Sequence, residues 1–393
     1  MSKKIKIDEI YDKNINFIFG SGTSADFIPT LKLEIKDKDN EEALSIETLA
    51  TKFEDSDKKK LRTLLFMYYY KKCIKPAMES TQKNNDSGEN EVLENYKNFL
   101  KNLLEIIKRR RSNLAQKCNI FTTNYDGFFT YAAEDLLENN DFVMNDGSHG
   151  FKKRVLNSRN FNKKIIRTGV FDRHEQELMQ INLIHLHGSI HWYKDNNNKD
   201  NDNIEIDYNI ERNKNREIEI CEEDTKKFSN ILESPDKNIT DAEDFSPDFQ
   251  DIKSEAFWDG YNSLPIVNPT KNKFHETVFE EHYYQMLRYL SYELEKPNSI
   301  LIVFGFSFKD EHIKNLVKRS LSNPELHVYI CCYDQKEKGV FEGFFNEFDN
   351  VEYIVREDCK DDEFLDFSYF NENVFTTKPV SETSPKNQEV SGQ

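Results

Sequence analysis

Four short polar segments carry the side chains of this chain that could do chemistry, and each directly follows an apolar run. They are Gly20–Ser24, Thr122–Asp126, His187–Ser189 and Gly305–Asp310. Together they offer glycines and hydroxyls that suit an anion, an Asn and an Asp that suit hydroxyl or amide groups, and a histidine that titrates near neutrality. Because an open parallel sheet binds ligands beyond the carboxyl ends of its strands, the shared position predicts a single site.

The first segment has the composition of a nucleotide phosphate cradle. The apolar run Ile15–Phe19 leads directly into Gly20, Ser21, Gly22, Thr23 and Ser24. Glycines allow close approach of the backbone to an anion, and hydroxyls and the N–H groups of a following helix supply donors. A Gly-x-Gly pair also occurs in many plain turns, so a strand–turn–helix corner without a ligand stays open as the alternative.

The other segments offer polar groups with two interpretations each. Asn124 could hold a ribose hydroxyl or orient a water, and Asp126 could accept from an amide or stabilise positive charge, although both residue types are also common in turns and helix caps. His187 could be a general base or a satisfied polar group. His185 and His187 share one strand face and, with His191, could hold a metal, but no carboxylate or cysteine follows at a fixed spacing, so we expect no metal.

Several common catalytic motifs do not occur. No Walker lysine follows Gly22, and the chain has neither a His-Glu-x-x-His helix motif nor a Gly-x-Ser-x-Gly elbow. P-loop NTPase, zincin and α/β-hydrolase functions are therefore disfavoured.

The elements that must position these segments alternate between strands and helices. Apolar runs predict strands at 15–19, 119–123, 181–186, 299–304 and 327–332, with amphipathic helices between them. This order predicts an α/β fold with a doubly wound, Rossmann-like parallel sheet. We expect one main domain over residues 1–375, an inserted helical module at 35–115, a polar acidic insertion at 194–258 with few apolar anchors, and a disordered tail at 376–393.

Composition narrows the function classes. The net charge of −17 over 393 residues argues against a broad grip on nucleic acid. The basic run Lys108–Arg111 ends a predicted helix, where it would complement the helix dipole, with a polyanion contact as the alternative. Six cysteines show no metal-knuckle spacing, and no apolar signal core or membrane-spanning run is seen, so we expect a cytoplasmic protein with reduced cysteines.

The four segments, in this order, resemble the sirtuin superfamily. Gly20-Ser21-Gly22-Thr23-Ser24, followed by Ile28-Pro29, is similar to the Gly-Ala-Gly-x-Ser and Ile-Pro of the sirtuin loop. Thr122-Thr123-Asn124-Tyr125-Asp126 is similar to Thr-Gln-Asn-Ile-Asp. His187-Gly188 matches the catalytic His-Gly, and Gly305-Phe306-Ser307-Phe308 matches Gly-Thr-Ser-Leu.

Two departures from the sirtuin pattern matter. Only Cys221 lies between His187 and Ser299, so the four-cysteine zinc module of sirtuin deacylases is missing, and Thr123 replaces the usual Gln. Both features resemble the prokaryotic sirtuin-like NAD-hydrolysing proteins of anti-phage defence. Size and the early helical insertion are similar to members encoded beside a HerA-type hexameric ATPase.

The resemblance implies a role for each site residue. Three residues would be catalytic. Asn124 would hold the ribose or a water, Asp126 would contact the carboxamide, and His187 would act as the base. NAD would be held by Gly20, Ser21, Gly22, Thr23, Ser24, Thr123, Gly305 and Ser307, with Asp334 near the adenosine ribose. The main domain would then bind NAD as a substrate without a metal, and hydrolysis to ADP-ribose and nicotinamide would stay latent until triggered.

The resemblance also implies partners, and it leaves rivals open. A homo-oligomer and a HerA-type ATPase are expected, with no direct nucleic-acid binding and no membrane. The rivals are a non-catalytic NAD or ADP-ribose sensor, a deacylase or ADP-ribosyltransferase, and an assembly subunit whose helical module matters more than its pocket.

Overall fold

The fold is built on a seven-stranded parallel sheet. The computed structural model describes residues 5–38, 43–54, 56–80, 87–111, 114–171, 174–194, 203–269, 281–356 and 363–377. In spatial order the strands are β15 (Val351–Ile354), β14 (His327–Cys331), β13 (Ser299–Phe304), β1 (Asn14–Phe19), β4 (Lys117–Thr122), β10 (Met179–His185) and β5 (Phe142–Asn145). Every neighbouring pair in this sheet is parallel. The predicted doubly wound α/β sheet is confirmed.

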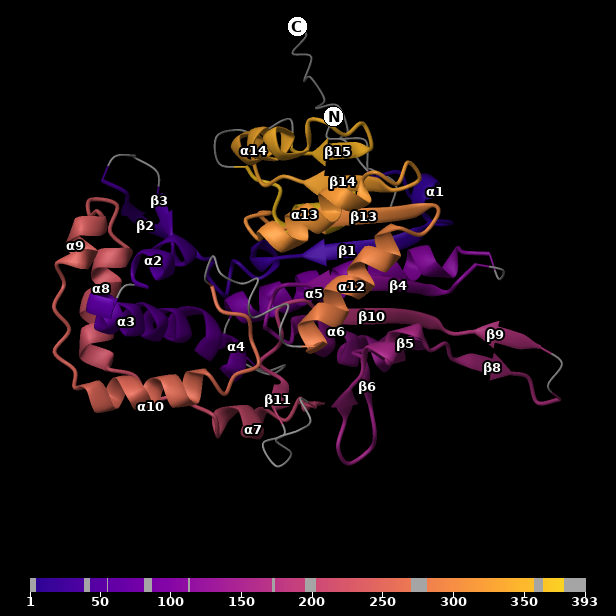
Figure 1. Cartoon of the computed structure of the whole chain (residues 1–393). Coiled ribbons are helices and arrows are strands. Elements are labelled where there is room, and N and C mark those ends of the chain that lie inside the picture. The colour runs from indigo at the N-terminus through magenta and orange to yellow at the C-terminus, as the bar shows by residue number, and fades with distance from the viewer. Residues whose placement is uncertain are drawn as a thin grey trace, which may run out of the picture.

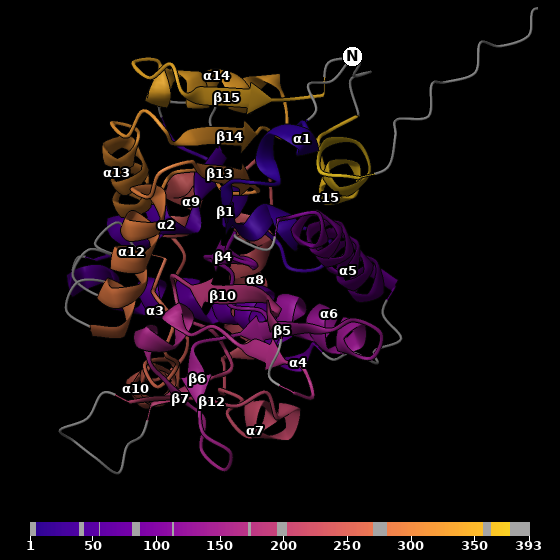
Figure 2. The ribbon, with the colours of Figure 1, turned by 90° about the vertical axis from the view of Figure 1, so that its right-hand side faces the viewer.

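Helices cover both faces of the sheet, as Figure 2 shows. One face carries α5 (Ser87–Lys108), α6 (Phe128–Leu137) and α15 (Phe367–Tyr369), and the other carries α12 (Glu281–Leu294), α13 (Glu311–Ser320) and α14 (Gln335–Phe345). Alternation along β1 explains the two layers: Phe17 and Phe19 pack with α5, whereas Ile18 packs in the cluster that contains α12 and α13. The strands are buried on both faces, which is why they read as continuous apolar runs.

A row of buried amides crosses the sheet and interrupts its apolar core. Asn16, Asn119, Asn182 and Asn145 stand opposite one another on four adjacent strands. Each side chain donates to the next: Asn119 to Asn16 at 2.8 Å, Asn182 to Asn119 at 2.8 Å, and Asn145 to Asn182 at 2.9 Å. A slip of one residue would move an amide to the opposite face and leave its partners unpaired, so this amide row specifies the register.

A separate helical subdomain lies beyond one end of the sheet, at the left of Figure 1. It combines α2 (Ile46–Lys52), α3 (Lys59–Tyr69) and α4 (Lys75–Glu79) with α8 (Glu222–Leu232), α9 (Ile239–Glu243) and α10 (Asp251–Tyr261). The Tyr68–Tyr70 run is part of its buried core. The short strands β2 (Lys32–Lys36) and β3 (Ala43–Ser45) pair beside it, and Lys36 N donates to Lys237 O at 3.1 Å.

The described part of the 194–258 segment differs from the expected polar insertion with few apolar anchors. Phe228, Leu232, Phe249 and Phe257 are buried against the helices of the first insertion. Charged residues dominate the sequence because each helix buries only one narrow stripe. Residues 195–202 of that segment lie outside the described part, as does the expected tail beyond Thr377.

The first insertion is also divided differently from the sequence-based expectation. Its second half is α5, which covers the sheet instead of joining the helical subdomain, and its apolar stripe from Val92 to Ile107 is buried there.

The basic run does end a helix, with Lys108 in the last turn of α5, but Arg110 has a role that neither interpretation of the run predicted. The α5 helix ends at Lys108, and the Arg110 side chain is buried. Its guanidinium donates to four backbone carbonyls, those of Tyr11, Lys13, Ala115 and Lys117, at 2.6–3.0 Å. Arg110 therefore joins the segments that lead into β1 and β4.

Smaller elements complete the described fold. A four-stranded antiparallel sheet holds β11 (Trp192–Lys194), β12 (Ile204–Ile206), β7 (Val155–Leu156) and β6 (Ser148–His149), and β8 (Ile166–Thr168) pairs with β9 (Glu175–Glu177) in a hairpin. The helices α1 (Ile7–Ile10) and α7 (Ile210–Lys214) are short. Within the described residues no helix has the length and apolar character needed to cross a bilayer, and the five cysteines described there are buried free thiols.

The amide row makes a stability prediction. Replacing Asn119 with Val should lower the free energy of unfolding by about 2–4 kcal/mol, because Asn16 loses its donor and Asn182 loses an acceptor inside the core. Urea unfolding measures the change. The double variant Asn16→Val/Asn119→Val is the matched control, and it should be no less stable than Asn119→Val because the orphaned carbonyl is gone. A single variant as stable as the wild type would contradict this role of the row.

Candidate functional site at the strand ends

The four polar segments meet at the carboxyl end of the sheet. They follow β1, β4, β10 and β13, of which β1, β4 and β10 are consecutive neighbours and β13 lies on the other side of β1. The chain leaves β1 toward β4 and later returns to β13 across it, so the strand order reverses at β1. In doubly wound sheets this topological switch point is where ligands bind.

The glycine loop differs from the predicted cradle in one respect. After Gly20 the chain forms one 3-10 turn, Ser21–Thr23, and no α-helix follows before β2, so no helix N-terminus supplies donors there. The N–H groups of Gly20 and Gly22 donate to the carbonyls of Phe304 and Gly305, at 3.1 and 3.0 Å. Ser21 and Ser307 are exposed residues of the two loops.

Close contact between these two loops explains the glycines. A Cβ on Gly20 would lie 2.5 Å from the carbonyl oxygen of Gly305, and Gly305 itself has a φ of +62°. Side chains are excluded from both positions by sterics and by backbone conformation. The glycines therefore hold the loop after β1 against the loop after β13, which brings Ser21 and Ser307 to the same end of the sheet.

Behind this contact lies a buried network of polar side chains. Asn124 Nδ2 donates to Thr23 Oγ1 at 2.8 Å, and Thr23 Oγ1 donates to Gly20 O at 2.7 Å. Ser24 Oγ donates to Asp126 Oδ2 at 3.0 Å, and Phe128 N donates to the other oxygen of Asp126 at 3.2 Å. The structure thus brings together Thr23, Ser24, Asn124 and Asp126, which the sequence places on two loops a hundred residues apart.

Tyr96 is a member of this network that sequence reasoning missed. Its hydroxyl donates to Thr23 Oγ1 at 2.9 Å and lies 2.8 Å from Ser24 Oγ. Asn124 Nδ2 lies 3.4 Å from the same hydroxyl. The signal was a tyrosine inside the apolar stripe of α5, since a buried phenol needs a polar partner. Only the packing of α5 on the sheet shows which partners it has.

Burial sets the protonation of this network. Desolvation raises the pKa of Asp126 to about 6, and the hydrogen bond from Ser24 opposes the rise. Burial also raises the pKa of Tyr96, so the phenol stays protonated and can donate. Asp126 is therefore a carboxyl group that changes charge close to neutral pH.

His187 pairs with an acid that follows a different strand. Its Nε2 lies 2.9 Å from Asp310 Oδ2, and both side chains are buried. Asp310 also caps α13, since its Oδ1 accepts from the N–H groups of His312 and Ile313. A carboxylate beside Nε2 favours the tautomer that carries its proton there, and the lone pair on Nδ1 would then suit a general base.

The loop that presents Asp310 has an unusual backbone. Phe308 has a φ of +54°, in the left-handed region that non-glycine residues rarely adopt. Its ring is fully buried and packs edge-on against Phe341 and Phe345 of α14. This packing stabilises the conformation and sets the direction in which the chain reaches Asp310.

The three histidines considered as metal ligands have separate partners. His185 Nδ1 lies 3.1 Å from the carbonyl of Asn124, and His191 lies 3.0 Å from the Tyr131 hydroxyl and 3.2 Å from Asn213 Nδ2. Desolvation lowers the pKa of His185 to about 4 and that of His191 to about 3. Across the described residues, no group of three His, Cys, Asp or Glu side chains is arranged to hold a metal ion.

The remaining predicted residues lie at the same end of the sheet. Thr123 is half-buried, and its N–H donates to Phe19 O at 3.0 Å. Asp334 follows β14 and caps α14 by accepting from Glu337 N at 2.7 Å. Beside it, the exposed Tyr333 ring stacks on Phe364 with a centroid distance of 4.4 Å.

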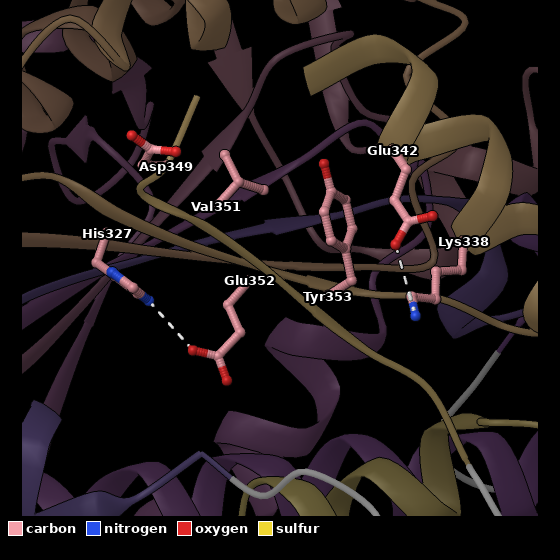
Figure 3. Close-up of a pocket in the computed structure, with 7 residues that line it drawn as sticks. All are labelled: His327, Lys338, Glu342, Asp349, Val351, Glu352 and Tyr353. Carbon is pink, nitrogen blue, oxygen red and sulfur yellow. Dashed lines mark ion pairs between the residues drawn. The ribbon is translucent and has the colours of Figure 1, made fainter. Parts of the chain in front are cut away.

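Two surface hollows differ in their relation to this site. One, of about 160 Å³, is lined partly by Pro265, Ile266 and Tyr283, and Val267 N beside it donates to His187 O at 2.9 Å. The other, of about 400 Å³, lies over β14 and β15 and is lined mostly by charged residues. It contains two half-buried ion pairs, His327–Glu352 and Lys338–Glu342, each at 3.5 Å (Figure 3). The larger hollow borders the first residues of β15 and β14, so it is separate from the carboxyl-end loops.

Asp126 makes a pH-dependent prediction. Its folded pKa of about 6 lies above the ordinary 3.8, so the folded state favours the protonated acid, and stability present at low pH is lost as the pH rises through 6. Replacing Asp126 with Asn removes this loss. The stability of the variant relative to the wild type should therefore increase by about 2–3 kcal/mol between pH 4 and pH 7.5.

Urea unfolding at both pH values measures that difference, and the comparison with the wild type cancels the opposite contributions of His185 and His191. Asp259→Asn, at an exposed position, is the control and should show no such increase. If the free energies of unfolding of Asp126→Asn and of the wild type changed equally between the two pH values, the raised pKa of Asp126 would be contradicted.

The double role of Asp310 predicts different results for two substitutions. Asp310→Ala should cost about 1 kcal/mol of unfolding free energy because α13 loses its cap, whereas Asp310→Asn keeps a capping oxygen and should cost much less. Asp334→Ala, which removes the equivalent cap of α14, calibrates the loss. Equal losses for Asp310→Ala and Asp310→Asn in thermal or urea unfolding would assign the stabilisation to the His187 pair instead.

A scan against protein-family models gives no match for this chain, and a search of curated proteins gives none either. The strand-end geometry and the sequence motifs are therefore the basis on which a function can be proposed.

Proposed function

We propose that the chain hydrolyses NAD to ADP-ribose and nicotinamide. The observation that carries the proposal is the meeting of Asn124, Asp126 and Ser24 in one buried network, with the His187–Asp310 pair on the neighbouring strand ends. The sirtuin-like order of the four segments supports the same chemistry. The missing cysteine module favours water over an acyl-lysine as the acceptor.

The proposed reaction breaks the bond between nicotinamide and ribose. As neutral nicotinamide leaves, the ribose carbon becomes oxocarbenium-like, and a site that favours this state lowers the barrier. A water held by Asn124 adds to that carbon, and Nδ1 of His187 takes the proton that the water loses. Asp126 accepts a hydrogen bond from the carboxamide. The products are nicotinamide, ADP-ribose and one proton.

Fewer residues are proposed to bind the pyrophosphate than the glycine motif implied. Because the N–H groups of Gly20 and Gly22 already donate to the carbonyls of Phe304 and Gly305, the hydroxyls of the exposed residues Ser21 and Ser307 are the proposed phosphate donors. Thr23 and Ser24 are buried and would act through Asn124 and Asp126. Asp334, beside the Tyr333–Phe364 stack, is proposed for the adenosine ribose.

Latency is part of the proposal. The polar groups of the network already hydrogen-bond one another, so a bound NAD must replace internal contacts such as that between Asn124 and Thr23. A partner or trigger that opens this arrangement would switch hydrolysis on. We propose NAD depletion in anti-phage defence, in the cytoplasm and beside a HerA-type ATPase, as the setting in which this control operates.

The closed network also favours a second candidate, a sensor that binds NAD or ADP-ribose without cleaving it. Mass spectrometry of ligand recovered from the protein separates the two functions. Recovery of intact NAD after long incubation with the activated protein would favour the sensor.

The test of hydrolysis is nicotinamide release from NAD by the full chain, alone and with the HerA-type ATPase. Asn124→Ala and His187→Ala should each reduce release at least 100-fold, because general-base catalysis contributes about 10²–10⁴-fold. Asp310→Asn should reduce it while changing stability little. Lys101→Glu, an exposed substitution on α5, is the control and should leave release unchanged. Release that survives both Asn124→Ala and His187→Ala contradicts the assignment.

A further inference from the structure

Residues 151–171 form a basic arm that stands apart in charge from the rest of the chain. The segment contains seven Lys and Arg residues and no Asp or Glu. Since the whole chain carries −17, the remainder carries −24. Lys152, Arg159 and Lys163 are exposed, whereas Arg154, Lys164 and Arg167 pair with acids of the same chain.

The basic arm also concentrates exposed apolar side chains. Of the eleven large hydrophobic residues exposed in the described part of the chain, five lie in it: Phe151, Ile165, Ile166, Val170 and Phe171. Phe151 and Val170 are almost fully exposed and lie at the turns of the β6–β7 and β8–β9 hairpins. Large apolar side chains gathered at exposed turns are typical of an interaction surface.

The arm is anchored between its two turns. Phe161 is buried beside Tyr289 of α12, at a ring distance of 5.6 Å, and Asn160 donates to Gly147 O at 2.8 Å. Figure 1 shows the β8–β9 hairpin extending away from the sheet on the side opposite the helical subdomain. The arm therefore has a fixed base and projecting ends.

A surface of complementary chemistry lies at the other end of the molecule. On α10, Asp251, Glu255 and Asp259 are exposed at a spacing of four residues, and Ile252 beside them is 68% exposed. We call these four residues the α10 stripe. Residues 222–259 contain twelve acidic and four basic residues. Figure 1 places α10 and the β8–β9 hairpin at opposite ends of the molecule, with the β6–β7 hairpin between them, so the β8–β9 hairpin does not reach the stripe of its own chain.

We propose that the basic arm of one chain docks on the α10 stripe of a second copy, which makes a head-to-tail assembly. Lysine and arginine side chains face carboxylates, and the exposed phenylalanines cover Ile252 and the apolar stems around it. Contacts of this kind close into rings or extend as filaments, depending on the rotation between copies. This inference does not depend on the proposed NAD hydrolysis.

The test is the mass of the full chain in solution, measured by analytical ultracentrifugation at micromolar concentration. The wild type should sediment at a multiple of 46.5 kDa of at least two. The arm variant Phe151→Ser/Phe171→Ser/Arg159→Glu/Lys163→Glu and the stripe variant Ile252→Ser/Glu255→Lys/Asp259→Lys should each be monomeric. All the changed side chains are exposed, so circular dichroism and unfolding midpoints should match the wild type.

Mixing the two monomeric variants gives the sharpest result. The stripe variant keeps an intact arm and the arm variant keeps an intact stripe, so one contact can form, and the mixture should give a dimer that grows no further. High salt should dissociate it, because screening weakens the charge contacts. The control Lys101→Glu/Lys336→Glu/Tyr284→Ser/Tyr292→Ser changes as many exposed basic and aromatic residues outside the arm, and it should keep the wild-type mass.

Three outcomes would overturn the proposal. They are a monomeric wild type, an arm variant with the wild-type mass, and a mixture of the variants that stays monomeric. A labelled DNA duplex is added to the wild type and the arm variant in parallel. A monomeric wild type that binds the duplex, with binding lost in the arm variant, would assign the arm to nucleic acid instead.

Discussion

The register of the central sheet depends on one row of buried amides. Asn16, Asn119, Asn182 and Asn145 hydrogen-bond in sequence across four strands, in a core that is mostly apolar. Apolar side chains tolerate a shifted pairing better than amides do, because a buried amide without a partner costs about 1–3 kcal/mol. The row thus fixes which residues pair across neighbouring strands, and hydrophobic burial alone does not fix this. It also places the carboxyl ends of β1, β4 and β10 in a defined relation.

The candidate site follows from that relation. With β1 paired to β4 in one register, Thr23 and Ser24 reach Asn124 and Asp126, and Tyr96 of α5 completes the network from above the sheet. On the other side of β1, the contact between Gly20 and Gly305 sets the loop that leads to Asp310, the partner of His187. Both the buried network and the His187–Asp310 pair are carried by loops that follow strands of this sheet. A change of register between the strands would therefore move the residues of each apart.

The helical subdomain packs against the loops that follow β4 and β10. It buries Ile190, which follows His187 by three residues, and Tyr125, between Asn124 and Asp126, donates to Val267 O at 2.6 Å. A change in the packing of this subdomain would therefore be felt by the residues proposed for chemistry. This connection is a physical route by which assembly or a partner could control the latent activity that we propose.

The sequence by itself determined five of the seven strands, their alternation with helices and the parallel sheet, because runs buried on both faces are visible as continuous apolar segments. The edge strands β5 and β15 were not predicted, because they are short and mostly half-buried. The sequence also marked Asn124, Asp126 and His187, since polar residues after such runs stand out. Tertiary structure alone decided that Tyr96 and Asp310 join them, that Arg110 binds four carbonyls, and that the acidic segment forms helices around α3. These outcomes depend on contacts between residues far apart in the chain, and local patterns of hydrophobicity and charge carry no information about which distant groups will meet.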